Sequence, residues 1–165
     1  MWLKVFSYGY VQGQVAEMLF LFIAIGILIK FGFKKTLLFG LIAMFLRYLS
    51  FYLGKELDRQ WWYSIGILTH GLIFGLFFVS GQVYTDKVVP KEIRAQAQGF
   101  LAFIIWGVGY LTGTLLNGWM IGHYRMEGKC DWSVLFLIST IFTILLIILL
   151  LLLFKNEGIK NSNFD

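Results

Sequence analysis

The sequence predicts an all-α protein, a polytopic bundle of five transmembrane helices, on the basis of its composition and its long apolar runs. Hydrophobic residues make up 59% of the 165 residues, charged residues make up only 14%, and proline occurs once. A soluble domain carries about 25% charged residues, and a domain of this size could not hide so much apolar surface from water. Membrane helices of roughly 20 apolar residues, long enough to cross a core of about 30 Å, account for that surface.

Five apolar runs are separated by short polar loops, and each run is predicted to be one membrane-spanning helix. The runs cover residues 11–29, 36–53, 61–84, 97–121 and 132–154. Residues 11–154 are therefore expected to form one five-helix bundle, in which consecutive helices lie antiparallel because their loops are short. Residues 1–10 are expected to be an external segment, and the polar tail at residues 155–165 is expected to be disordered.

Glycine pairs predict close contacts between helices in the third and fourth runs. GxxxG spacing, which lets helix backbones approach closely, occurs at Gly71–Gly75, Gly109–Gly113 and Gly118–Gly122. These pairs indicate a packed bundle without specifying which helices meet.

Loop charges predict which face of the membrane each loop occupies, because cytoplasmic loops are enriched in lysine and arginine. The loops at 30–35 and 87–94 and the C-terminal tail carry eight such residues, and the loops on the other face carry five. The C-terminus is thus predicted to be cytoplasmic and the N-terminus external. Five spans that begin outside without a cleavable signal peptide suggest the C-terminal part of a longer protein, with a genuine five-span protein as the alternative.

Other functional classes find no support in the sequence. The net charge of +5 does not indicate a nucleic-acid partner, because the basic residues lie in loops between apolar runs. Cys130 is the only cysteine, so no disulfide, zinc site or iron–sulfur centre can be built from cysteines. Neither a metal nor a cofactor is expected. A membrane-embedded enzyme is not expected either, because no clustered histidine or acidic motif is present.

Three ionisable residues interrupt the first three runs: Glu17, Arg47 and His70. Such residues are costly in a bilayer core and usually line a water-filled path or pair with one another. Glu17 shares a helix face with Gln14, and it either binds substrate and carries a proton or is a structural partner for a cation. Arg47 either forms an ion pair that responds to protonation or extends to the headgroups. His70 either contacts substrate and relays protons or is a neutral residue bonded to a neighbouring helix.

These three residues are predicted to lie at one depth. At a rise of 1.5 Å per residue, Glu17 and Arg47 lie roughly 10 Å below the outer edge of the bilayer and His70 about 13 Å below it. Transporters bind substrate near the midplane. The shared level therefore predicts a transport site.

Three stretches resemble the C-terminal half of a major facilitator superfamily transporter, most closely the nucleoside:proton symporters. Residues 11–17 (VQGQVAE) resemble the eighth helix of that family, which contributes a Gly-Gln-x-x-Glu pattern to the nucleoside site. Residues 30–35 (KFGFKK), continued to Arg47, resemble the basic loop and ninth helix, and residues 90–99 (PKEIRAQAQG) resemble the loop into the eleventh helix. The family has a tyrosine and an aspartate where this chain has His70 and Gly75.

This resemblance implies that the five spans correspond to helices eight to twelve, so that the N-terminal half and the seventh helix are absent. It implies that Gln14 and Glu17 bind substrate and that Glu17 is a candidate for proton coupling. His70 is taken as a further substrate contact. Arg47 and His70 are taken to tune that coupling, and they also resemble an arginine and a histidine of the sugar:proton symporters.

The predicted function is proton symport of a small polar solute by alternating access in a bacterial inner membrane. A nucleoside is the expected solute, and a sugar is the alternative. Contacts among Lys34, Lys35, Asp86 and Arg94 are expected to close a cytoplasmic gate. The expected partners are substrate, protons, the lipid bilayer and the missing N-terminal half, without which the chain should be inactive. A non-transporting membrane scaffold derived from a transporter is a further alternative.

Overall fold

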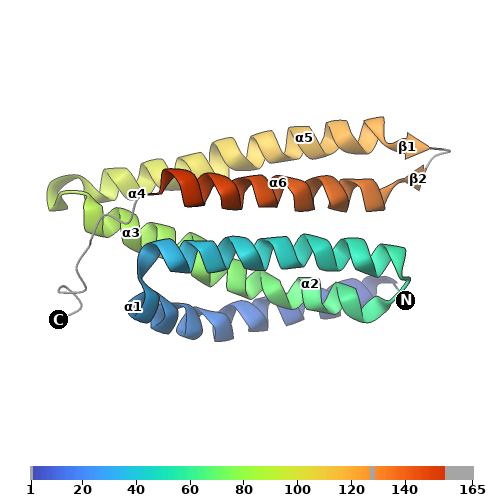
Figure 1. The fold of residues 1–165 in the computed structure, drawn as a ribbon, viewed down its shortest axis with the longest axis horizontal. Helices are drawn as coiled ribbons and strands as arrows, with labels where there is room; N and C mark the ends of the chain where they lie inside the picture. The colour runs from blue at the N-terminus through green and yellow to red at the C-terminus, as the bar shows by residue number, and fades with distance from the viewer. Residues whose placement is uncertain (1, 127–128, 155–165) are drawn as a thin grey trace.

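The computed structural model describes residues 2–126 and 129–154, with side chains described for residues 17–125 and 130–154. This part of the chain is an elongated bundle whose long helices all run along one axis (Figure 1). Its elements in order are α1 (Trp2–Glu56), α2 (Gln60–Ile73), the π-helix η1 (Phe74–Val79), α3 (Ser80–Val88), the 3-10 helix η2 (Lys91–Ile93), α4 (Arg94–Ala102), the π-helix η3 (Phe103–Gly109), α5 (Tyr110–His123), β1 (Arg125–Met126), β2 (Lys129–Cys130) and α6 (Trp132–Leu153).

Helix α1 is a hairpin of two helical arms that reverses at Gly32 (Figure 1). Gly32 has φ 76° and ψ 174°, a conformation open to glycine because it has no β-carbon. The Thr36 hydroxyl donates a hydrogen bond of 2.8 Å to the Gly32 carbonyl and so pairs a backbone oxygen at the break. The loop predicted over residues 30–35 is therefore reduced to one non-helical residue. The runs at 11–29 and 36–53 lie in the two arms.

Three helical stretches of the described residues are long and apolar enough to cross a membrane, namely Gln60–Val88, Lys91–His123 and Trp132–Leu153. They contain the third and fourth predicted runs and nearly all of the fifth. Beyond its helices, the described chain has one short antiparallel pairing, in which Arg125 is opposite Cys130 and Met126 is opposite Lys129. This pairing closes the turn between α5 and α6.

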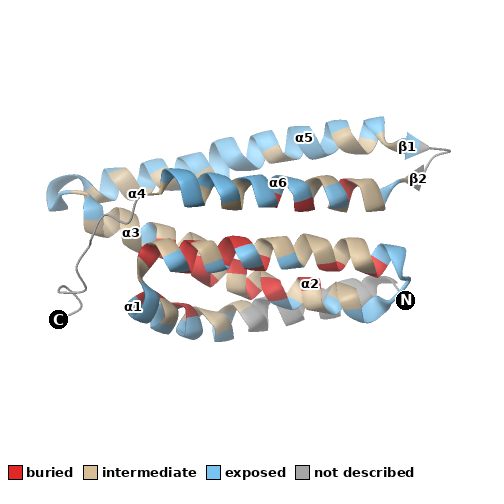
Figure 2. Ribbon diagram, viewed as in Figure 1, coloured by how far each residue is buried: buried red, intermediate tan, exposed pale blue. Residues whose placement is uncertain are grey.

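Burial is concentrated where the two arms of α1 meet α2 and η1 (Figure 2). Ala24, Leu41, Ala43, Ile73 and Leu76 are among the buried side chains there. By contrast, no residue of α4, η3 or α5 is buried. Large apolar side chains on an exposed helix face are expected where lipid or further protein replaces water.

Glycines permit the closest approaches in this core. A β-carbon at Gly40 would lie 2.9 Å from Cβ and 3.0 Å from the backbone nitrogen of Phe77, and one at Gly75 would lie 2.8 Å from Cβ of Ala24. The glycine pattern of the third run thus marks a real contact at Gly75. The same expectation is wrong for the fourth run within the described residues, because a β-carbon added at Gly113, Gly118 or Gly122 would meet nothing within 4 Å. A small residue permits close packing but does not supply the partner.

Replacing Gly40 with alanine is expected to lower the free energy of unfolding by about 1–3 kcal/mol, because the added methyl group forces α1 away from the backbone of η1. The matched control is Gly26→Ala on the same helix, where a β-carbon meets nothing within 4 Å. Denaturant unfolding of the purified protein in detergent measures both. Equal losses in the two variants would contradict the close approach at Gly40.

Candidate functional site: an arginine, histidine and glutamate chain

Glu17, Arg47 and His70 are brought to one level by the positions of the two chain reversals. Glu17 lies 15 residues before Gly32 and Arg47 lies 15 residues after it, so each is at the same height on its arm of α1. The turn at residues 57–59 lies about midway between Arg47 and His70 in the same way. Because helices rise by a constant amount per residue, equal spacing from a reversal produces equal depth.

The three side chains form one hydrogen-bonded chain across three helical segments. Nη1 of Arg47 donates to Nδ1 of His70 over 2.5 Å. Nε2 of His70 lies 3.0 Å from Oε1 of Glu17. An arginine can only donate, so Nδ1 must be an acceptor and the histidine proton must be on Nε2. The geometry therefore selects a neutral imidazole that donates to the Glu17 carboxylate.

The surroundings of Arg47 hold its guanidinium inside the bundle. Its Cζ lies 5.5 Å from the centre of the Phe51 ring, a distance at which a cation is attracted to an aromatic face. Among the described residues, Nε of Arg47 is buried and has no hydrogen-bond partner. Arg47 thus reaches inward to His70 rather than along the helix to the end of the bundle.

Within the hydrogen-bonded chain of Arg47, His70 and Glu17, the side chain of His70, the middle member, is more exposed than that of Glu17. The side chain of His70 is 41% exposed and that of Glu17 is 20% exposed in the described structure. A second proton on His70 would place an N–H opposite the N–H of Arg47, which would break that hydrogen bond. A proton on Glu17 would instead remove the negative charge that balances Arg47. Either event changes how the three helical segments are held together.

The family of the chain follows from its match to known proteins. A model of the nucleoside H+ symporter family matches residues 5–158. The chain belongs to the nucleoside H+ symporter family. The resemblance seen in the three sequence stretches is thereby confirmed, and the protein is an integral membrane protein of a transporter family.

Relatives in this family are nucleoside permeases. The chain is 26% identical over 148 residues to nucleoside permease NupG of Escherichia coli strain K12, covering 89% of this chain and 35% of that protein. It is 28% identical over 134 residues to the xanthosine permease of the same strain, covering 81% of this chain and 32% of that protein. A crystal structure of NupG superposes with a TM-score of 0.82 at 26% identity, covering 90% of this chain and 38% of that one. The chain thus spans about a third of the length of these relatives.

Glu17 and His70, two of the three residues predicted to bind substrate, are in direct contact. Gln14 lies in α1, but its side chain is outside the described residues. Arg47 joins the same group through His70. The structure therefore brings together Glu17, Arg47 and His70 from the first three predicted runs. Their roles in transport remain predictions.

The reversal of α1, the end of α3 and the start of α4, which carry the four predicted gate residues, lie at the same end of the bundle as the end of α6 (Figure 1). Nη1 of Arg94 lies 3.5 Å from Oδ2 of Asp86, a partly exposed pair that contributes about 1 kcal/mol or less. Nζ of Lys34 donates instead to the Leu151 carbonyl over 3.5 Å. Lys35 is exposed. Among the described residues, Asp86 of α3 thus pairs with Arg94 of α4, and neither lysine of α1 pairs with Asp86.

The sequence did not single out an aromatic stack between η1 and η3. The rings of Phe78 and Trp106 are parallel within 16° with centroids 5.8 Å apart, and Phe78 also lies 6.0 Å from Phe74. Phe74 follows His70 by four residues. Both stacked residues lie in π-helices, which are frequent at functional sites. With 31 aromatic residues in the chain (17 Phe, 8 Tyr and 6 Trp), only the contact between η1 and η3 distinguishes this pair.

Replacing His70 with phenylalanine is expected to lower the free energy of unfolding by about 1–3 kcal/mol, because Nη1 of Arg47 and Oε1 of Glu17 lose their partner. Glu17→Gln should cost less, because a glutamine oxygen still accepts from Nε2. The control is His123→Phe, since His123 is exposed and stacks on Trp119 without an ion pair. Unfolding in detergent measures all three. The hydrogen-bonded chain is contradicted if the two histidine variants behave alike.

Proposed function

We propose that this chain forms part of the transport pathway of a proton-coupled nucleoside symporter. The observation that carries the proposal is the hydrogen-bonded chain from Arg47 through His70 to Glu17 within an apolar helix bundle. Side chains of this kind persist in membrane segments where ions or polar solutes pass. The family assignment and the nucleoside permeases among the relatives support a nucleoside as the solute.

In this proposal Glu17 carries the coupled proton. With Glu17 ionised and His70 neutral, the positive charge of Arg47 is balanced across the imidazole. Protonation of Glu17 leaves Arg47 unbalanced, which is costly in a low-dielectric interior. Only a difference in stability between two states can shift their populations. The protonated protein would therefore favour the state in which Arg47 is better solvated or differently paired.

The substrate would bind between the polar chain and the aromatic stack. Glu17, His70 and Gln14 supply hydrogen-bonding groups suited to ribose hydroxyls and base edges. Phe78 and Trp106 supply flat faces, and Trp106 is 57% exposed and available to a ligand. Stacking of a base on an aromatic ring contributes about 1–3 kcal/mol. The polar and aromatic parts of a nucleoside thus both find matching groups.

The proposed topology has five membrane spans, with the two arms of α1 as the first two. The C-terminus is placed in the cytoplasm of a bacterial inner membrane, so Lys34, Lys35, Asp86 and Arg94 are at the inner face. They would form part of the inner gate in one state of an alternating-access cycle. About two thirds of the length of the relatives lies outside the region that matches this chain. In the proposed transporter, helices equivalent to that unmatched region would form the opposite wall of the substrate pathway. The 165 residues alone would not transport.

Glu17→Gln is expected to abolish pH-driven accumulation of labelled nucleoside while preserving exchange of labelled for unlabelled nucleoside, because exchange needs no net proton movement. Uptake is measured in bacteria that lack nucleoside transport of their own, with the protein expressed from its complete reading frame. The matched control is Glu56→Gln at the exposed end of α1, which should transport normally. Undiminished accumulation in the Glu17 variant would exclude the coupling role. Absence of uptake by the unmodified protein would favour a scaffold.

Trp106→Ala is expected to raise the KM for nucleoside uptake roughly tenfold through loss of one stacking face, whereas Trp106→Phe should retain most affinity. Trp119→Ala is the control, because Trp119 lies on α5 and stacks on His123. Competition by unlabelled nucleosides and sugars in the same assay identifies the solute class. Inhibition by sugars alone would select the sugar symporter, and an equal effect of both tryptophan variants would contradict the stacking site.

A further inference from the structure

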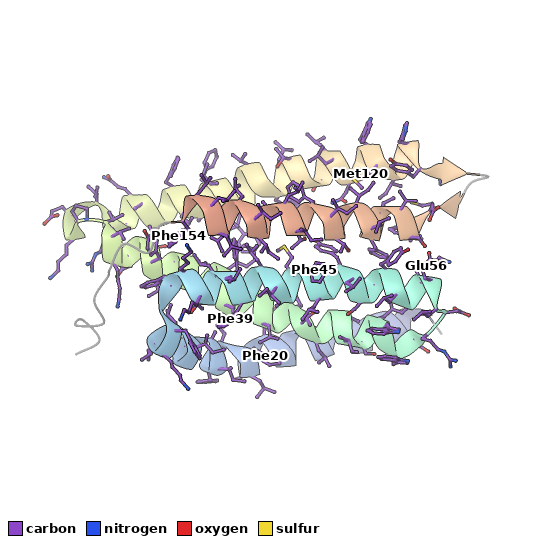
Figure 3. The ribbon with its side chains drawn as sticks, in the orientation of Figure 1. Phe20, Phe39, Phe45, Glu56, Met120 and Phe154 are labelled. Atoms are coloured by element: carbon purple, nitrogen blue, oxygen red, sulfur yellow. The ribbon has the colours of Figure 1, made fainter. Side chains whose placement is uncertain are left out.

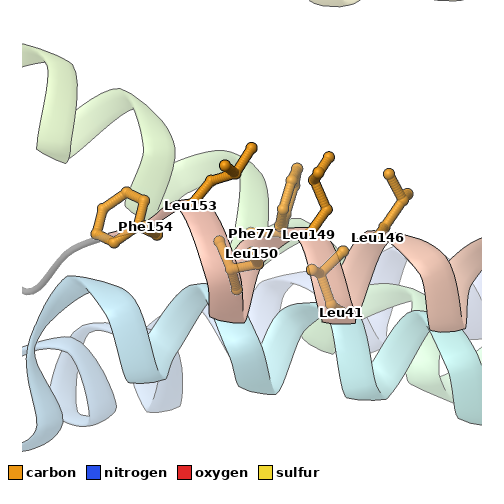
Figure 4. A pocket seen from close by; sticks show the side chains of 7 residues that line it. All are labelled: Leu41, Phe77, Leu146, Leu149, Leu150, Leu153 and Phe154. Atoms are coloured by element: carbon orange, nitrogen blue, oxygen red, sulfur yellow. The ribbon is translucent and has the colours of Figure 1, made fainter.

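An apolar groove opens on the side of the bundle between α1, η1 and α6 (Figure 4). Its volume is about 290 Å³, and its lining consists of Leu41, Phe77, Leu146, Leu149, Leu150, Leu153 and Phe154. Every one of these side chains is aliphatic or aromatic. Leu149 and Leu153, at 50% and 70% exposed, mark its open side. Because α6 is long and apolar enough to cross a membrane, this opening is expected to face hydrocarbon rather than water.

A cation lies at one end of this groove. Nζ of Lys34 donates to the carbonyl of Leu151, which lies between two lining residues of α6. That carbonyl belongs to the last turn of the helix, where backbone oxygens lack partners within the helix. A lysine ammonium has three donors, so two remain for another acceptor. Phe154 is at this end of the bundle, opposite the end that carries Glu56 (Figure 3).

Other lysines add to the positive charge at this end. Lys30 precedes the Gly32 reversal and Lys35 follows it, and both side chains are exposed. The apolar groove therefore leads from the interior of the membrane to a cluster of cations at its surface. A molecule that fits this pattern has a hydrocarbon chain attached to an anionic group.

We propose that the groove binds one acyl chain of an anionic phospholipid, whose phosphate is held by Lys34. An apolar groove by itself has no hydrophobic preference for a bound lipid over the surrounding lipid, because both environments are hydrocarbon. Selectivity must therefore come from the headgroup. A lysine near an anionic headgroup contributes about a fivefold preference. This site is separate from the Arg47, His70 and Glu17 chain, and it shares Lys34 with the proposed gate.

The test uses native mass spectrometry of the delipidated protein, expressed from its complete reading frame, with phosphatidylglycerol and phosphatidylcholine of identical acyl chains in competition. The unmodified protein should retain phosphatidylglycerol preferentially. Lys34→Gln should reduce that preference about fivefold while keeping a donor for the Leu151 carbonyl. The control Lys91→Gln removes an exposed lysine on η2 that does not line the groove, and it should leave the preference unchanged.

A second pair of variants tests the groove itself. Leu149→Trp fills the groove and should reduce binding of both lipids, whereas Leu145→Trp places the same bulk on an exposed face of α6 that does not line it. Equal loss of preference in the Lys34 and Lys91 variants would overturn the proposal in favour of diffuse surface charge. Unchanged lipid retention in Leu149→Trp, with or without a change in oligomeric state, would also overturn it.

Discussion

The hydrogen-bonded chain of Arg47, His70 and Glu17 is the interaction on which the arrangement of the described helices depends. It joins both arms of α1 to α2, and each of its members would be costly to bury in a bilayer without the others. Apolar contacts between helices discriminate weakly among registers, because a leucine contacts lipid as favourably as it contacts another leucine. Directional hydrogen bonds at one level select one register.

Close packing supports this chain from both sides. Gly75 lets η1 approach the first arm of α1 at Ala24, and Gly40 lets the second arm approach η1 at Phe77. Gly32 lets the two arms reverse with one non-helical residue. These glycines contribute no side-chain contacts, but without them the three polar side chains could not be held at hydrogen-bonding distance. Backbone geometry and side-chain chemistry are therefore coupled at the site.

The stretch from Lys91 to His123 has a different character. It is long and apolar enough to span a membrane, yet none of its residues is buried in the described structure. It contacts the neighbouring π-helix η1 through the stacked rings of Trp106, which is exposed, and Phe78. The groove beside α6, in contrast, is uniformly apolar and suits only hydrocarbon.

The sequence by itself determined the membrane class, the positions of the apolar runs and the identity of the polar residues within them. These features follow from hydrophobicity and spacing along the chain, which are local properties. It also placed Glu17, Arg47 and His70 at one depth, because depth depends only on rise per residue and on where the chain turns. Only the tertiary structure decided the one-residue reversal at Gly32, the order of hydrogen bonds through His70 and the pairing of Phe78 with Trp106. Those features depend on how each helix is rotated about its own axis. Contacts between segments that are distant in sequence set this rotation. The pattern of apolar residues cannot predict it when every face of a helix is hydrophobic.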